Sequence, residues 1–246
     1  MYLDEETYEE LKGEVAHYIE QCGMSYPLNV EKFARRMKLK AVPYSSLGDR
    51  AHSASMQASQ DGFLCEKNCA YTYIFFNDEK IKERQETSIL HEIGHLVLDH
   101  NSTPQKTDEE KEAEAKFFAK YAKAPMPLIH LLPIKTVETI QKAFKLSRQA
   151  AEIALDNYEK WLGRFNGKYK DYELKILSLE RVGLDAYIEE LKIQKERSSV
   201  RYQRAEGQNH KSNLVKKSRG QEIPLQDCNG TSVQRDLYEV RQMAGP

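Results

Sequence analysis

The spacing His-Glu-x-x-His at residues 91–95 constrains this chain of 246 residues more than any other feature. It lies within "SILHEIGHLVLDH", whose apolar period predicts a helix. Residues four apart share one face of a helix, so His91 and His95 should direct their imidazoles to the same point, as two ligands of a tetrahedral zinc do. The alternative is a pair of surface histidines on an amphipathic helix, with Glu92 as a solvated carboxylate.

A catalytic zinc needs a third protein ligand and one open position. The extended form H-E-x-x-H-x-x-G-x-x-H would supply a third histidine, but Leu98 replaces its glycine and His100 comes one residue early. We therefore expect His100 to have a capping or packing role, and the third ligand to come from another segment.

The next predicted helix, from Thr107 to about Ala124, supplies a candidate for that ligand. Its apolar stripe repeats at helical spacing, and Glu112 continues the stripe toward the interior. Glu114 is expected to point away, and so is Glu110, which forms a capping box with Thr107. A buried unpaired carboxylate is costly unless it binds a cation, which favours Glu112 as the ligand. The alternative is an ion pair between Glu112 and a buried arginine or lysine.

This set of residues predicts zinc-dependent peptide hydrolysis. Zn2+ held by His91, His95 and Glu112 would keep a position open for water and would polarise a scissile carbonyl. Glu92 could take the proton of the attacking water and return it to the leaving amine.

The strand that precedes the metal helix is predicted at residues 71–76, paired with an earlier strand through a turn. Its free edge could bind an extended peptide across the zinc, or it could be an ordinary interior strand. The small polar stretch from residue 45 to 62 is predicted to be a loop.

The composition of the chain predicts a soluble, cytoplasmic protein. The net charge is −1, the N-terminus lacks a signal sequence, and no apolar run is long enough to cross a membrane. The cysteines at 22, 65, 69 and 228 suggest free thiols, although Cys65 and Cys69 could hold a metal if further ligands converged on them. The basic run from Lys192 to Arg219 favours a solvated tail over a nucleic-acid contact, so direct nucleic-acid binding is not expected.

Over residues 26–160 the sequence resembles the ImmA/IrrE family of metallopeptidases. The similar stretches are "YPLNVEKFARRMKLKAVPYSSL", "DGFLCEKNCAYTYIFFND", "ERQETSILHEIGHLVLDH", "EAEAKFFAKYAKAP" and "FKLSRQAAEIAL". Aligned on this pattern, the family's glutamate ligand falls on Glu112. Thr87, Ser88 and Lys116 depart from the residues usual in the family, which affects local packing rather than the ligands.

The resemblance implies an α+β, zincin-like metallopeptidase domain, mostly helical with a small sheet beside the metal helix. We place this domain at residues 1–163, followed by a charged extension at 164–246 that begins helical and then becomes disordered. It further implies a regulatory endopeptidase that cleaves a helix-turn-helix repressor of a mobile element or a stress response. The alternative is a non-proteolytic binding protein that keeps the fold and docks a repressor.

Overall fold

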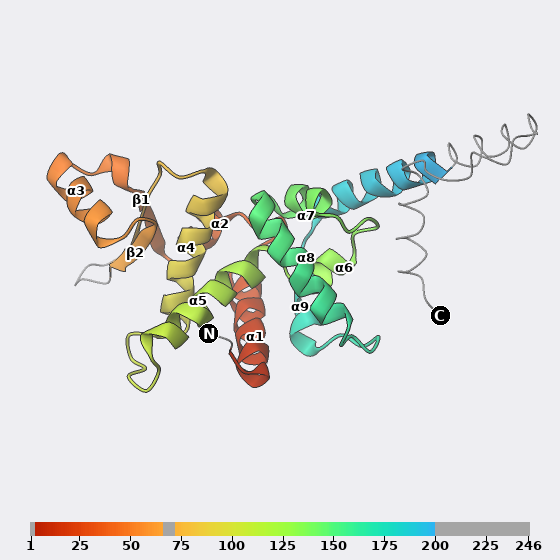
Figure 1. Ribbon diagram of the computed structural model, residues 1–246, viewed down its shortest axis with the longest axis horizontal. Coiled ribbons are helices and arrows are strands. Elements are labelled where there is room, and N and C mark those ends of the chain that lie inside the picture. Colours follow the sequence, from red (N-terminus) through yellow and green to blue (C-terminus); the bar gives the residue numbers. More distant parts are fainter. Residues whose placement is uncertain (1–2, 66–71, 200–246) are drawn as a thin grey trace, which may run out of the picture. The chain divides into compact units, whose positions relative to one another are not determined.

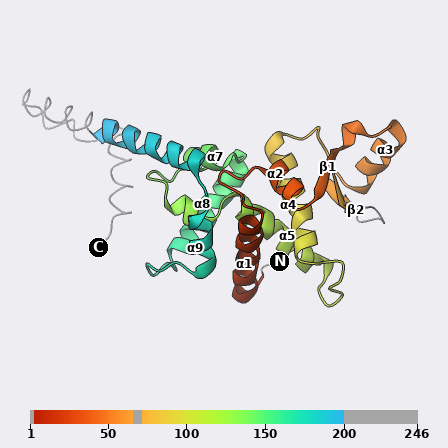
Figure 2. The ribbon, with the colours of Figure 1, turned by 180° about the vertical axis from the view of Figure 1, so that it is seen from behind.

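The computed structural model describes residues 3–65 and 72–199, and residues Met1–Lys195 form one compact unit. Helices dominate this unit, and three short strands form one small sheet beside helix α4 (Figures 1 and 2). The predicted α+β class is therefore confirmed. The helices are α1 (Glu5–Gln21), α2 (Val30–Arg36), η1 (Tyr44–Ser46), α3 (Asp49–Ala58), α4 (Lys82–Val97), α5 (Asp108–Lys123), α6 (Met126–His130), α7 (Val137–Phe144), α8 (Arg148–Leu162) and α9 (Asp171–Ser178).

The sheet contains β1 (Leu39–Pro43), β2 (Gly62–Cys65) and β3 (Thr72–Phe76) in the order β1-β3-β2. The predicted strand pair is present, since β2 runs antiparallel to β3. Strand β3 is central, however, because β1 pairs with its other side in parallel. The idea that β3 offers a free edge to a peptide is therefore wrong, and β2 is the edge strand next to α4.

The predicted loop at residues 45–62 contains helix α3, so this prediction is wrong over Asp49–Ala58. Alanine, methionine, glutamine and arginine in this segment favour a helix. The partly buried face of α3 carries His52, Ser55 and Met56, of which only Met56 is a large apolar residue. Its apolar stripe is therefore weak in the sequence.

Helices α4 and α5 pack together and position the residues of interest (Figure 1). Ile89, Leu90 and Ile93 of α4 are buried in the same core as Phe118 and Ala119 of α5. The capping box of Thr107 and Glu110 is present at the start of α5, as predicted. Helix α4 begins at Lys82, six residues before the stretch "SILHEIGHLVLDH".

Gly94 sets how closely these two helices approach. A Cβ atom at Gly94 would lie 3.2 Å from both Ala115 Cα and Phe118 Cβ. Only a residue without a side chain fits such a contact with the backbone of α5 without displacement. The approach brings the face of α4 that carries His91 and His95 against α5.

Replacing Gly94 with valine should therefore lower the free energy of unfolding by about 1–3 kcal/mol, because the added side chain overpacks the contact between the helices. Urea unfolding followed by circular dichroism measures this loss. Gly13→Val is the matched control, since a Cβ at Gly13 of α1 meets nothing within 4 Å. Equal stability of the two variants would contradict the packing role of Gly94.

The chain after Gly163 continues to contribute to the core of the unit. Ile176 of α9 is buried in the core, and residues 182–195 are helical and add Leu184, Ile188 and Leu191 to it. The predicted domain boundary after Gly163 remains a proposal. Among the residues that the structure describes, every helix falls short of the length and apolar character that a membrane crossing requires.

Candidate metal centre

The structure brings His91, His95 and Glu112 together between α4 and α5. The Nε2 atoms of His91 and His95 are 3.1 Å apart. Carboxylate oxygens of Glu112 lie 3.5 Å from His91 Nε2 and 3.2 Å from His95 Nε2. The ligand atoms of these three side chains all lie within 4.8 Å of one another, close enough to hold one metal ion. No other group of three His, Cys, Asp or Glu side chains in the described part of the chain does so.

The spacing of these donor atoms fits a tetrahedral metal. Zinc bonds to nitrogen and oxygen are about 2.0–2.1 Å long, so two ligand atoms at corners of a tetrahedron are separated by about 3.3 Å. The separations of 3.1, 3.2 and 3.5 Å lie close to this value. Two imidazoles and one carboxylate are also donors that zinc prefers. The residues therefore fit a metal ion at this point.

Glu112 lies beside the histidines as predicted, but its side chain is not buried in the interior as expected. Its side chain is 46% exposed, whereas that of Glu114, expected to point away, is only 4% exposed. At about 100° per residue, both carboxylates flank the apolar stripe of α5, on opposite sides. The chain after α4 covers the Glu114 side, and the Glu112 side borders an open cavity. Glu112 pairs with Lys116, which is 62% exposed, so the predicted alternative of a buried lysine or arginine partner is wrong.

The electrostatic surroundings keep the three side chains in the forms that bind a cation. Burial lowers the pKa of His91, and burial together with His91 and His100 lowers the pKa of His95 to about 4. Burial acts to raise the pKa of Glu112, but His91, Lys116 and His95 outweigh it and hold that pKa below its usual value. Near neutral pH the two imidazoles are uncharged and Glu112 is a carboxylate, as metal ligation requires.

Glu92 lies beside this group, in contact with the edge strand of the sheet. The backbone N–H of Leu64 in β2 donates a hydrogen bond to the Glu92 carboxylate. Burial raises the pKa of Glu92 to about 7, with a further contribution from the charge of Glu112. Glu92 is thus a carboxylate with increased proton affinity, placed between the three converging side chains and β2.

His100 has a contact that sequence reasoning missed. Its Nδ1 lies 2.8 Å from Nδ1 of His95, and its Nε2 lies 2.9 Å from Glu114 Oε2. These contacts agree with the expectation that His100 is not a third ligand. They also go beyond a capping or packing role, because His100 links His95 to Glu114. Burial lowers the pKa of His100, although Glu114 acts in the opposite direction. These contacts depend on Asp99, whose φ of 48° turns the chain back after α4.

A hollow with a volume of about 1320 Å³ includes Glu112 in its wall. Residues of α1, α5, α8 and α9 line it, together with the segment between α8 and α9. Its aromatic lining includes Tyr8, Phe117, Trp161, Phe165 and Tyr169. Glu112 therefore belongs both to the candidate metal centre and to the wall of this large, partly aromatic cavity.

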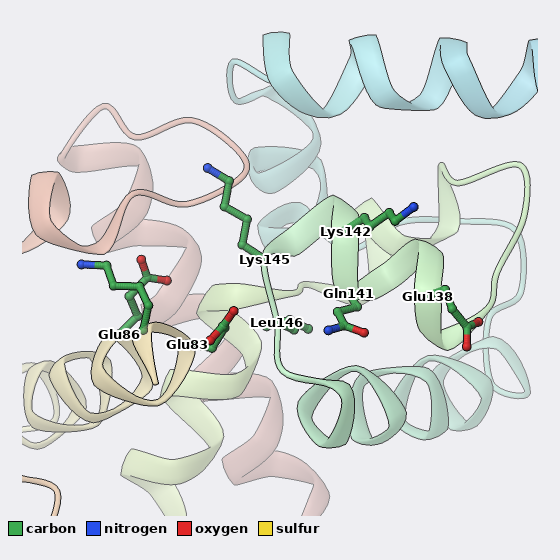
Figure 3. A pocket seen from close by; sticks show the side chains of 8 residues that line it. Glu83, Glu86, Glu138, Gln141, Lys142, Lys145 and Leu146 are labelled. Carbon is green, nitrogen blue, oxygen red and sulfur yellow. The ribbon is translucent and has the colours of Figure 1, made fainter. Parts of the chain in front are cut away.

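A smaller hollow of about 490 Å³ lies between α4 and α7 (Figure 3). Its charged residues come from α4 on one side and from α7 and the residues after it on the other. Glu86 pairs with Lys123, and Lys82 pairs with Glu31. The carboxylates of its wall, Glu83, Glu86 and Glu138, do not belong to the group of converging ligand atoms found among the described residues, so this hollow offers no second metal site there.

Two further predictions concern residues that are only partly described. Cys65 ends β2 as a free cysteine, whereas Cys69 lies outside the described residues. Most of the basic run from Lys192 to Arg219 also lies outside them.

Residues 46–156 match the family model described as the IrrE N-terminal-like domain of peptidase family M78. The match contains His91, Glu92, His95 and Glu112. Searches of curated proteins and of solved structures gave no match to the chain.

Proposed function

Since its IrrE N-terminal-like domain assigns this chain to the ImmA/IrrE family of metallopeptidases, we propose that it is a zinc-dependent endopeptidase. The proposed ligands are His91, His95 and Glu112, and Glu92 is the proposed general base. The observation that carries this proposal is the convergence of the three donor side chains at the spacing of a tetrahedral site, with the partly buried carboxylate of Glu92 beside them.

The chemistry divides between the metal and Glu92. A bound zinc ion would supply a Lewis acid that polarises the scissile carbonyl and makes a water molecule more acidic. Glu92 accepts the proton of the attacking water, and its raised pKa increases its ability to hold that proton. The protonated carboxyl then donates to the leaving amine. The backbone N–H of Leu64 is placed to orient the Glu92 carboxylate.

The surroundings of the site suit a polypeptide substrate. Strand β2 is the edge strand beside Glu92, so an extended segment of substrate could pair with it and place a peptide bond over the site. The cavity that begins at Glu112 has a volume of about 1320 Å³, above the roughly 300–1,000 Å³ of typical small-molecule sites. We propose that it receives substrate residues on one side of the scissile bond.

We further propose that the substrate is a helix-turn-helix repressor and that the protein acts in the cytoplasm. The purified protein, incubated with Zn2+ and a small helix-turn-helix repressor encoded by a neighbouring gene, should produce discrete fragments detectable by mass spectrometry. A zinc chelator should stop cleavage, and added zinc should restore it, because the proposed reaction depends on the zinc ion bound by the three ligands. An intact repressor that stays bound to the zinc-loaded protein would instead support the non-proteolytic alternative.

A further inference from the structure

A buried chain of hydrogen bonds connects His95 with Glu114 on the side away from the proposed metal. His95 Nδ1 lies 2.8 Å from His100 Nδ1, and His100 Nε2 lies 2.9 Å from Glu114 Oε2. Lys106 Nζ donates to both oxygens of Glu114, at 2.7 and 2.8 Å. The side chains of His100 and Glu114 are only 3% and 4% exposed. A buried polar chain of this kind is costly unless each member is satisfied, and here each one has a partner.

The link between α4 and α5 is folded around this chain. Helix α4 ends at Val97, and Asp99 adopts the left-handed conformation with a φ of 48°. The turn directs His100 back beneath the helix, where its backbone N–H donates to the carbonyl of His95 at 3.1 Å. Lys106, which lies in the same link, donates to Glu114 of α5. The end of α4, the link and α5 thus all contribute side chains next to the His95 imidazole.

The order of donors along the chain determines the tautomer of His95. The Glu114 carboxylate paired with Lys106 can only accept, so His100 Nε2 must carry the proton that it donates. Nδ1 of a neutral His100 is then an acceptor, and His95 Nδ1 must donate to it. This leaves the lone pair of His95 on Nε2, the atom that faces His91 and Glu112. In the other tautomer, two lone pairs would face each other at 2.8 Å.

We propose that Glu114 and His100 are positioning residues that hold His95 in the tautomer and orientation needed to bind the metal. This inference rests on the proposed metal site and extends it, because it assigns a role to two buried residues that are not ligands. Outer partners of ligating histidines typically contribute 10–100-fold to metal affinity. Lys106 supports the chain by holding Glu114 in place through hydrogen bonds to both of its carboxylate oxygens.

The test compares Glu114→Gln with Glu110→Ala. Glutamine can either accept from His100 Nε2 or donate to it, so both tautomers of His100 and of His95 become available. Zinc affinity, measured by competition with a chelator, should fall about 10–100-fold in Glu114→Gln. Glu110→Ala removes a cap from the same helix and should lower the melting temperature while leaving zinc affinity unchanged.

His100 provides a rescue test. Glutamine at this position keeps an acceptor for His95 and a donor for Glu114, whereas leucine keeps neither. His100→Gln should therefore retain more zinc affinity than His100→Leu, with circular dichroism used to verify that both fold. Retention of equal affinity by the two variants would overturn the proposal.

Nitrogen-15 NMR of the metal-free protein reads the tautomer directly. Wild type should show His95 protonated on Nδ1, and Glu114→Gln should show a mixture of tautomers. Identical tautomers and identical zinc affinities in the two proteins would overturn the positioning role. Failure of the wild type to bind zinc would instead refute the metal site, even if the NMR signals matched the expected tautomer.

Discussion

Glu92→Gln should reduce the rate of peptide cleavage by about 10²–10⁴-fold, the range that a positioned general base contributes. Glutamine has nearly the same shape and keeps an oxygen that can accept the hydrogen bond from Leu64 N–H. It cannot take a proton from the attacking water. The loss should therefore appear in the cleavage step, while the protein continues to fold and to bind zinc.

Initial rates of repressor cleavage and the zinc content of the purified variant measure these two effects separately. Glu83→Gln is the matched control, because Glu83 lies near the start of the same helix, in its first turn. This variant should cleave at the wild-type rate. Full biological function in Glu92→Gln would contradict proteolysis and favour a protein that acts by docking its partner.

Glu112→Ala should lower zinc affinity by more than the roughly 100-fold that loss of an outer partner can cost, because it removes a direct ligand. The histidines are predicted to remain in place, since they are held by α4. Glu112 is 46% exposed and its lysine partner is more exposed still. The free energy of unfolding of the metal-free protein should thus change by no more than about 0.5 kcal/mol, as for other surface substitutions.

Chelator competition gives the zinc affinity, and urea unfolding without metal gives the stability. Glu159→Ala is the control, because Glu159 is an exposed glutamate on α8. It should leave both quantities unchanged. Wild-type zinc affinity in Glu112→Ala would show that another group completes the site.

Local sequence rules accounted for the parts of the structure that depend on short spacing. The separation of His91 and His95 by four residues places both on one face of α4, and the capping box at Thr107 marks the start of α5. In each case the determining contacts lie within one or two turns of a helix.

The features that were missed depend on contacts between distant segments. The central place of β3 follows from its pairing with β1, which lies more than thirty positions earlier in the chain. The burial of Glu114 follows from the turn at Asp99, a residue whose left-handed conformation carries little signal in the sequence. Helical period alone could not distinguish the two flanks of α5, because the link from α4 covers only one of them.

The central claim is that His91, His95 and Glu112 bind zinc. Anomalous diffraction from crystals of the zinc-loaded protein, collected at the zinc absorption edge, locates the ion directly. The account predicts one peak about 2.0–2.1 Å from the Nε2 atoms of both histidines and from a carboxylate oxygen of Glu112. A zinc peak held by other residues, with these three side chains left unbound, would contradict it.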